Sequence, residues 1–295
     1  MSETLESLRR KINGAGDLES VVRTMKVLAA SNILQYEKAV SSLADYYRTV
    51  ESGLVVCLQR VGELTVAEKD WQSQSTKIGA IVFGSDQGLV GQFNDVLAQF
   101  TGNVLDRFPG EKRIWAVGER VQARLEDAGL PHTGLFPVPN AVNAITPLIG
   151  QILLESEMVR GKGEISQLYI FHNSPKPGAL YEPVVQRLLP LDEKWRSSVI
   201  QLKWPTNNIP EAINGAVPTL HGLIRQYLFV SLFLACAESL ASENASRLAA
   251  MQRAEKNIDE LLEELNRTFH RLRQSTIDEE LFDVISGSEA LSREK

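Results

Sequence analysis

Two long stretches, one at each end of the chain, repeat apolar residues with the spacing of an amphipathic helix. In the first, apolar or small residues recur every three or four positions over residues 5–57. In the second, the same spacing continues over residues 220–281, with charged residues between. Steps of three and four form the seam of a coiled coil. The pattern therefore predicts two long helices, over residues 1–60 and 218–292.

The prolines agree with this division. All twelve lie between Pro109 and Pro218, and a proline inside a helix costs about 3 kcal/mol. At 1.5 Å per residue the two helices would measure about 87 Å and about 105 Å, more than a globular domain holds. Two such helices most simply pack antiparallel, and the second should then extend past the first by about a dozen residues. That extension would need another protein around it.

One segment interrupts the first helical pattern. Residues 13–17 read Asn-Gly-Ala-Gly-Asp, which favours helix poorly, and Asp17 is a residue type suited to start a helix. We therefore expect a kink, a new helix start or a close helix–helix approach at this point.

Between the terminal stretches, short apolar strands alternate with helices. Strands are predicted at residues 77–84, 113–117, 167–171 and 183–190, and helices at residues 94–108, 119–127 and 141–159. Alternation of this kind favours an α/β, Rossmann-like domain with a small, mostly parallel sheet over residues 75–215. The proline-rich residues 195–218 are expected to be a loop that returns the chain to the second helix.

Composition narrows the classes of function. The formal net charge of −6 and the pI near 5.4 argue against a module that binds nucleic acid by neutralising phosphates. The two cysteines, Cys57 and Cys236, have apolar neighbours and are far apart in sequence. They are predicted to be small buried side chains in a reducing compartment, not a disulfide or a metal pair.

The sequence predicts only indirect membrane contact. The longest apolar run, residues 227–237, is about half of what a membrane span needs. The acidic first residues resemble neither a signal peptide nor a transit peptide, so we expect the chain to act in the compartment where it is made.

One loop deserves comparison with a nucleotide site. Residues 84–94 form a Gly-rich turn after the first predicted strand and before a helix, where backbone N–H groups can bind phosphate. The loop matches neither nucleotide-binding glycine motif, contains no lysine, and has no acidic partner for a ribose. We therefore expect a structural turn in which Asp86 or Asn94 caps backbone groups, and no cofactor.

Other catalytic chemistry has little support. Ser85 and Ser166 lack the context of a hydrolase nucleophile, and the acidic residues 259–264 fit a solvated helix face. The four histidines show no metal-binding spacing; they are His132, His172, His221 and His270. The sequence thus predicts a protein that is not an enzyme by itself.

Several motifs occur in one order along the whole chain. They are Leu8–Ile12 (LRRKI), Met25–Ala30 (MKVLAA), Ser85–Gly91 (SDQGLVG), Ser242–Met251 (SENASRLAAM), Arg271–Leu281 (RLRQSTIDEEL) and Val284–Leu291 (VISGSEAL). Together they closely resemble the gamma subunit of F-type rotary ATP synthases. Differences from the family's usual residues, at Gln87, Val90, Gln92, Asp278 and residues 18–22, suggest a divergent branch.

The resemblance implies a central rotor shaft. In that family the two terminal helices form an antiparallel coiled coil inside a ring of alternating alpha and beta subunits. The foot of the shaft joins the epsilon subunit and the membrane ring of c subunits, and the α/β domain binds no nucleotide. The implied place is the cytoplasmic side of the cell inner membrane, as a peripheral subunit, with residues 277–291 in an apolar bearing at the top of the ring.

The same resemblance implies the contact residues. Arg247, Arg273 and Gln274 fall on polar family positions expected to touch loops of the surrounding ring, and Met25 and Lys26 are expected to touch a beta-subunit loop. Two alternatives stay open from the residues alone. One is a coiled-coil scaffold with an α/β head, and the other is an enzyme whose nucleotide-binding domain dimerises through its coils.

Overall fold

The computed structural model describes residues 4–61, 77–130, 132–176, 179–191, 193–201, 210–213 and 215–293. The chain forms two compact units. The smaller consists of Met1–Ala29 with Leu248–Lys295, and the larger is Ala30–Arg247. Each is described by itself below.

The described residues contain six helices and five strands. The helices are α1 (Leu5–Val61), α2 (Phe93–Leu105), α3 (Glu119–Asp127), α4 (Val142–Gly161), α5 (Glu193–Ile200) and α6 (Ala216–Arg293). The strands are β1 (Ile78–Phe83), β2 (Lys112–Val117), β3 (Gly134–Phe136), β4 (Gln167–Lys176) and β5 (Ala179–Leu189). The predicted terminal helices and the predicted alternation between them are therefore present.

The larger unit contains one five-stranded sheet with the order β3-β2-β1-β4-β5. The first three pairings are parallel, and β5 pairs antiparallel with β4 at the edge. Pro183 lies in this edge strand, where a missing backbone donor is tolerated. The prediction of a mostly parallel α/β sheet is confirmed.

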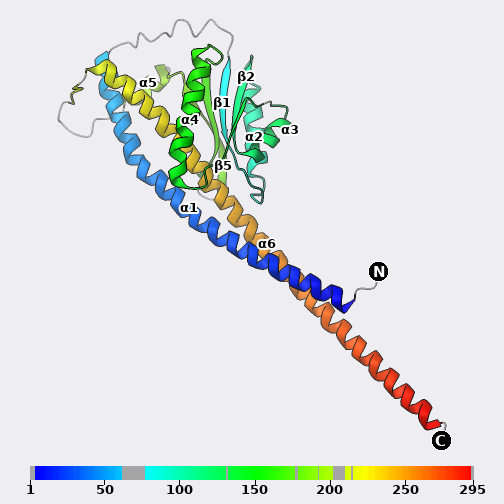
Figure 1. The fold of residues 1–295 in the computed structure, drawn as a ribbon. Coiled ribbons are helices and arrows are strands. Elements are labelled where there is room, and N and C mark those ends of the chain that lie inside the picture. Colours follow the sequence, from blue (N-terminus) through cyan, green and yellow to red (C-terminus); the bar gives the residue numbers. More distant parts are fainter. Residues whose placement is uncertain are drawn as a thin grey trace. The chain divides into compact units, whose positions relative to one another are not determined.

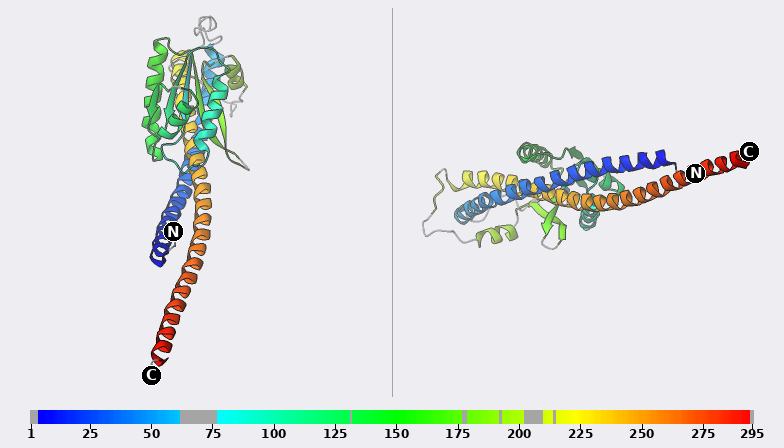
Figure 2. Two further views of the ribbon diagram at one scale, coloured as in Figure 1. Left: turned by 90° about the vertical axis from the view of Figure 1, so that its right-hand side faces the viewer. Right: turned by 90° about the horizontal axis from the view of Figure 1, so that it is seen from below.

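Both faces of this sheet are covered (Figures 1 and 2). On one face, side chains such as Ile81, Phe83 and Trp115 pack against α4 and against the part of α6 around Leu232. On the other face, alternate residues of the same strands, such as Val82, pack against α2 and α3. Strand residues are buried on both faces, which explains why β1 is apolar throughout.

Within the larger unit, α1 and α6 run antiparallel. The hydroxyl of Tyr46 donates to Oε1 of Gln226 at 3.0 Å, and Nδ2 of Asn32 donates to Oδ1 of Asn244 at 3.3 Å. As the residue number rises along α1 it falls along α6, which defines the antiparallel direction. Leu54 and its apolar neighbours fill the seam, and α5 packs against the same cluster through Val199.

Within the smaller unit, the start of α1 lies beside α6, and α6 extends past the N-terminus of α1 (Figures 1 and 2). Leu8, Ala15, Ala29 and Met251 are buried in the contact between the two helices. Further along α6, the described apolar side chains from Ile277 to Ile285 are exposed. The extension expected from the unequal helix lengths is present.

The expected helix start and the expected close helix approach at residues 13–17 are wrong. Helix α1 passes through this segment, so Asp17 lies inside a helix and does not start one. Nothing lies within 4 Å of the position that a Cβ would take at Gly14 or Gly16, so these glycines do not serve a close helix approach either. Burial of Ala15 in the seam outweighs the weak local helix preference.

Other expectations were incomplete. The strand β3 was not predicted, β4 is longer than predicted, and α5 occupies part of the expected return loop at residues 195–218. Residues 202–209 and 214 of that loop lie outside the described residues. Cys57 and Cys236 are buried and unbonded to each other, as expected.

One stretch of α6 is apolar enough to be compared with a membrane span. Among the described residues, one 18-residue window in this helix has a mean hydropathy of 1.4. Half of that window is buried inside the protein. A core helix of a soluble protein has the same composition, so the window does not by itself indicate membrane insertion.

Candidate functional site

The order of the strands defines where a ligand would bind if the α/β domain held one. From β1 the chain continues to β2 on one side, whereas β4 lies on the other side of β1. Open α/β sheets bind ligands at such a reversal, beyond the carboxyl ends of the strands. The Gly-rich loop that follows β1 lies at this point, so its contacts decide whether a site is open.

Polar side chains of the loop bind the protein's own backbone. The two carboxylate oxygens of Asp86 accept hydrogen bonds from the backbone N–H of Glu119 at 3.0 Å and of Val138 at 2.9 Å. Oδ1 of Asn94 accepts from the backbone N–H of Ser85 at 3.1 Å, and its Nδ2 donates to Oγ of Ser85 at 2.8 Å. The prediction that Asp86 and Asn94 cap backbone groups is confirmed.

Helix α6 also forms hydrogen bonds at the Gly-rich loop. Oγ of Ser239 donates to the carbonyl oxygen of Phe83 at 2.8 Å, and Oγ of Ser246 donates to that of Val90 at 2.6 Å. Both serines are buried. The first carbonyl directly precedes the Gly-rich loop and the second lies within it, so a helix of the same chain occupies the crevice that a nucleotide would use.

A third link joins β4 to α6. Nε2 of His172 lies 3.0 Å from Oε2 of Glu238, and Oγ of Ser174 donates to the same oxygen at 2.7 Å. Burial favours the neutral form of Glu238, but these hydrogen bonds outweigh it and lower the pKa of the carboxyl. Among the described residues, no cluster of three or more metal-ligating side chains occurs. His172 and Ser174 thus link β4 to α6 through Glu238.

A buried ion pair lies on α6 one turn further along. Nη2 of Arg247 is 2.5 Å from Oε1 of Glu243, and the two side chains are only 13% and 6% exposed. Burial raises the pKa of Glu243, and the charge of Arg247 and its hydrogen bond act against that rise. Burial and the charge of Glu243 also raise the pKa of Tyr36 on α1 to about 12. The sequence motif had drawn attention to Arg247 but not to its partner Glu243.

Met25 and Lys26, the two predicted contact residues on α1, lie half-buried in the smaller unit. Nζ of Lys26 is 2.5 Å from Oε2 of Glu255, and Nε of Arg23 is 3.5 Å from the other carboxylate oxygen. The hydrogen bond from Lys26 and the neighbouring positive charges lower the pKa of Glu255. Lys26 thus has a partner on α6.

Arg273 and Gln274, the predicted contact residues near the end of α6, are exposed. They lie on the same helix as Arg247, but Arg247 belongs to the larger unit and they belong to the smaller one. The described residues give neither side chain a hydrogen bond or an ion pair. The predicted contact residues therefore fall into two groups, exposed ones near the end of α6 and partly buried ones with internal partners.

Comparison with known proteins identifies the arrangement. A protein-family model with the description ATP synthase matches residues 4–291. The chain belongs to this ATP synthase family. The match includes both terminal helices as well as the α/β domain. Together with the names of the curated relatives, it confirms the gamma-subunit resemblance found in the motifs.

Curated relatives of this ATP synthase family member carry the name ATP synthase gamma chain. The protein of Syntrophus aciditrophicus is 26% identical over 303 residues, which cover 98% of this chain and 99% of the relative. That of Pasteurella multocida is 25% identical over 296 residues, which cover 97% and 99%. The likeness therefore extends from end to end in both directions.

Solved structures show the same fold. A chain of the Euglena gracilis mitochondrial ATP synthase, from a structure of OSCP, F1 and c-ring, has a TM-score of 0.61 at 15% identity and covers 97% of this chain and 94% of its own. One from the central stalk and c-ring of the Tetrahymena thermophila enzyme has a TM-score of 0.55 at 18% identity, with 79% and 99% covered. Terminal helices joined to an α/β domain are thus a shared architecture of these ATP synthase chains.

Sequence reasoning missed the side chains that join α6 to the sheet. Ser239 and Ser246 lie seven residues apart, about two helical turns, on α6. Small polar residues at seam positions are a signal that the facing surface offers hydrogen-bonding groups. That signal was available, but without the sheet in place it did not identify the acceptors.

Proposed function

We propose that this chain is the central rotor shaft of an F-type ATP synthase, a non-catalytic stalk subunit that links rotation of the membrane ring to the catalytic ring. The observation that carries this is the end-to-end family match over residues 4–291. A match confined to the α/β domain would fit many proteins. A match that includes both long helices fits a stalk.

The proposed mechanism is mechanical. Catalytic sites surround a shaft that lacks their symmetry, so each orientation of the shaft favours different conformations of those sites. Rotation then shifts their relative affinities for ATP, ADP and phosphate, without any bond being broken by the shaft itself. Ion flow through the membrane ring would turn the shaft during synthesis, and hydrolysis would turn it during pumping.

The proposed partners are the alpha, beta, epsilon and c subunits. Support comes from the solved relatives, whose structures are described as rotor, F1 and c-ring assemblies. Membrane contact would be indirect, through the c-ring, at the cytoplasmic side of the cell inner membrane. Residues 1–60 and 218–292 would form the shaft, and residues 75–215 the α/β domain beside its foot.

The proposed contact residues differ in the solvent exposure of their side chains. Arg273 and Gln274 are exposed on α6 and offer a guanidinium and an amide to the surrounding ring. Met25 and Lys26 are half-buried, and Arg247 is 13% exposed, so these would touch a partner only through part of their side chains. For Arg247 we propose that fixing the local position of α6 is the larger part of its role.

The internal bonds of the Gly-rich loop support a domain without a nucleotide. Asp86, Ser239 and Ser246 already use the polar groups that surround the strand reversal. A bound phosphate would have to displace these hydrogen bonds, and each of the two buried serine bonds would leave an unsatisfied group costing about 1–3 kcal/mol. We therefore expect no saturable binding of ATP or NAD by the isolated chain.

Co-expression with the neighbouring ATP synthase subunits tests the function. We expect the tagged chain to purify in a discrete complex with alpha, beta and epsilon subunits, and that complex to hydrolyse ATP. The isolated chain should show neither ATP hydrolysis nor saturable nucleotide binding by equilibrium dialysis. Heterogeneous cargo in place of discrete subunits would favour a scaffold, and hydrolysis by the pure chain that Asp86→Ala abolishes would favour an enzyme.

Arg273→Ala is expected to leave assembly intact and to lower ATP turnover of the complex several-fold. One charge-assisted hydrogen bond to the ring, worth roughly 1.5 to 3 kcal/mol, would be lost in the rotational states that use it. The measurement is steady-state hydrolysis by the purified complex. Arg271→Ala is the matched control, because residues two apart on a helix point in different directions. Equal turnover in the Arg273→Ala complex and the unmodified complex would remove Arg273 from the contact residues.

A further inference from the structure

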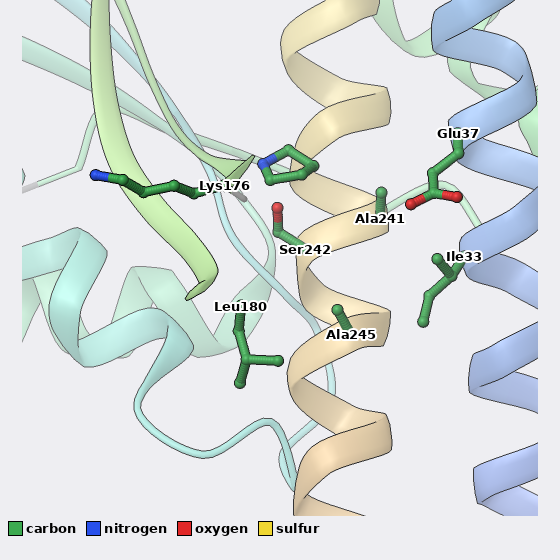
Figure 3. A pocket seen from close by; sticks show the side chains of 8 residues that line it. Ile33, Glu37, Lys176, Leu180, Ala241, Ser242 and Ala245 are labelled. Carbon is green, nitrogen blue, oxygen red and sulfur yellow. The ribbon is translucent and has the colours of Figure 1, made fainter. Parts of the chain in front are cut away.

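A groove opens in the larger unit between α1, α6 and the hairpin of β4 and β5 (Figure 3). Its volume is about 460 Å³. One wall carries Ile33 and Glu37 of α1, the opposite wall carries Leu180 of β5, and the floor is α6. Its floor residues lie on α6 between Ser239 and Ser246.

The floor of the groove has small side chains, which let a group from outside approach α6 closely. Ala241 and Ala245 lie one helical turn apart on α6, and their short side chains leave room above the helix. Leu180 stands beside them with 49% of its surface exposed. A small floor next to an exposed leucine suits a large apolar side chain from outside.

Ser242 adds a polar feature to this floor. Its side chain is fully buried, and its Oγ has no hydrogen-bond partner among the described residues. Other helical hydroxyls of the chain, such as those of Ser42 and Thr49, donate to the carbonyl one turn earlier. Because solvent does not reach this hydroxyl, a group that enters the groove would not contact it, and the apolar floor and the rim charges alone indicate the occupant.

The charges at the rim favour a basic occupant. Lys176 on the hairpin is already neutralised by its ion pair with Glu182. Glu37 is exposed and has no ion pair among the described residues. The rim therefore presents one uncompensated negative charge.

We propose that this groove receives a segment of a neighbouring subunit in which a large apolar side chain lies within about one helical turn of a lysine or arginine. The apolar side chain covers Ala241, Ala245 and Leu180. The cation pairs with Glu37. This inference rests on the proposed function, because the occupant belongs to the same assembly.

Site-specific photo-crosslinking in the assembled complex tests the groove. The photoreactive residue p-benzoylphenylalanine replaces Leu180 in one variant and Leu154 in a control. Leu154 is an exposed leucine on α4 outside the groove. We expect a discrete product with one partner subunit from position 180 and none from position 154. Mass spectrometry of that product should identify a peptide with an apolar residue next to lysine or arginine.

Two second-site changes sharpen the test. Ala245→Trp fills the groove and should lower the yield at position 180 by at least about tenfold. Glu37→Gln removes the rim charge without changing size and should lower it about twofold to fivefold. Asp45→Asn is the matched control on α1 outside the groove and should leave the yield unchanged.

Several outcomes would overturn the inference while leaving the proposed function intact. They are a fully formed complex with equal labelling at positions 180 and 154, a product with a second copy of this chain, and a captured peptide without a nearby basic residue. If no complex with ATP synthase subunits forms, the proposed function fails first and this inference fails with it.

Discussion

Gly118→Ala is expected to destabilise the α/β domain by about 3 kcal/mol or more. Gly118 follows β2 and precedes α3, and its φ of 117° lies in a region that side chains avoid. A Cβ there would lie 2.6 Å from the carbonyl oxygen of Ser85. Because the obstacle is backbone, a rotamer change cannot relieve it.

Gly129→Ala is the matched control for this prediction. Gly129 also has a positive φ, 73°, but nothing lies within 4 Å of the position of its Cβ. Its replacement should cost only the conformational strain, about 1–2 kcal/mol. Urea unfolding followed by circular dichroism measures both losses. Equal losses for the two variants would show that the contact with Ser85 contributes nothing.

Arg247→Ala is expected to lower the free energy of unfolding by about 3 kcal/mol at neutral pH. The change removes the partner of Glu243 and leaves a buried carboxylate uncompensated, a situation that typically costs about 3–5 kcal/mol. Since both residues lie on α6 beside the Gly-rich loop, we also expect faster proteolysis near that loop. Chemical denaturation of the isolated chain, or of the complex if the chain needs it, gives the value.

The pH dependence of this variant follows from the direction of the Glu243 pKa. Burial already raises that pKa, and removing Arg247 takes away the charge that opposes the rise. A carboxyl with a raised pKa in the folded state makes that state bind more protons, so stability falls as pH rises through the folded pKa. The deficit of Arg247→Ala should therefore be smallest in acid and should grow toward neutral pH.

The chain supplies a matched control for the buried pair. Arg267 and Glu263 have the same spacing on α6 but are exposed. Arg267→Ala should cost about 0.5 kcal/mol with little pH dependence. Glu243→Gln combined with Arg247→Ala should recover much of the loss, because no buried charge remains. A loss from Arg247→Ala no greater than that from Arg267→Ala would show that burial adds nothing to the pair.

The terminal helices could be predicted because their apolar spacing repeats over a long stretch of sequence. Seam residues such as Leu8, Tyr36, Leu54 and Met251 are buried as the apolar spacing required. A local exception of a few residues, as at Gly14 and Gly16, does not stop a helix whose neighbouring turns are held by packing. Over long stretches, the sum of many contacts outweighs local preference.

Short elements were harder to predict. Strand β3 has only three residues, Gly134–Phe136, and a three-residue segment carries too little alternation to be recognised. Strand β4 continues past the apolar residues into polar ones, because hydrogen bonds to β5 extend as far as the pairing of Lys176 with Ala179. In both cases the length of the strand depends on its pairing with a neighbouring strand. The sequence of one strand alone does not specify that pairing.

The local contacts of the candidate site could be predicted from the sequence, but its long-range contacts could not. The caps made by Asp86 and Asn94 follow from their position in a loop before a helix, where such side chains bind nearby N–H groups. The bonds from Ser239 to Phe83 and from His172 to Glu238 join residues far apart in sequence. Nothing in the local pattern selects those partners, since only the folded sheet brings them together.

The two serine bonds from α6 have a mechanical consequence. Ser239 and Ser246 are two turns apart on one side of the helix, about 10 Å along its axis. Ser239 bonds to the carbonyl of Phe83, the last residue of β1, and Ser246 bonds to the carbonyl of Val90 in the Gly-rich loop. A helix held by hydrogen bonds at two separate points can neither slide along its axis nor rotate about it unless both bonds break. In the larger unit, torque on this stretch of α6 would therefore act on β1 and on the loop that follows it.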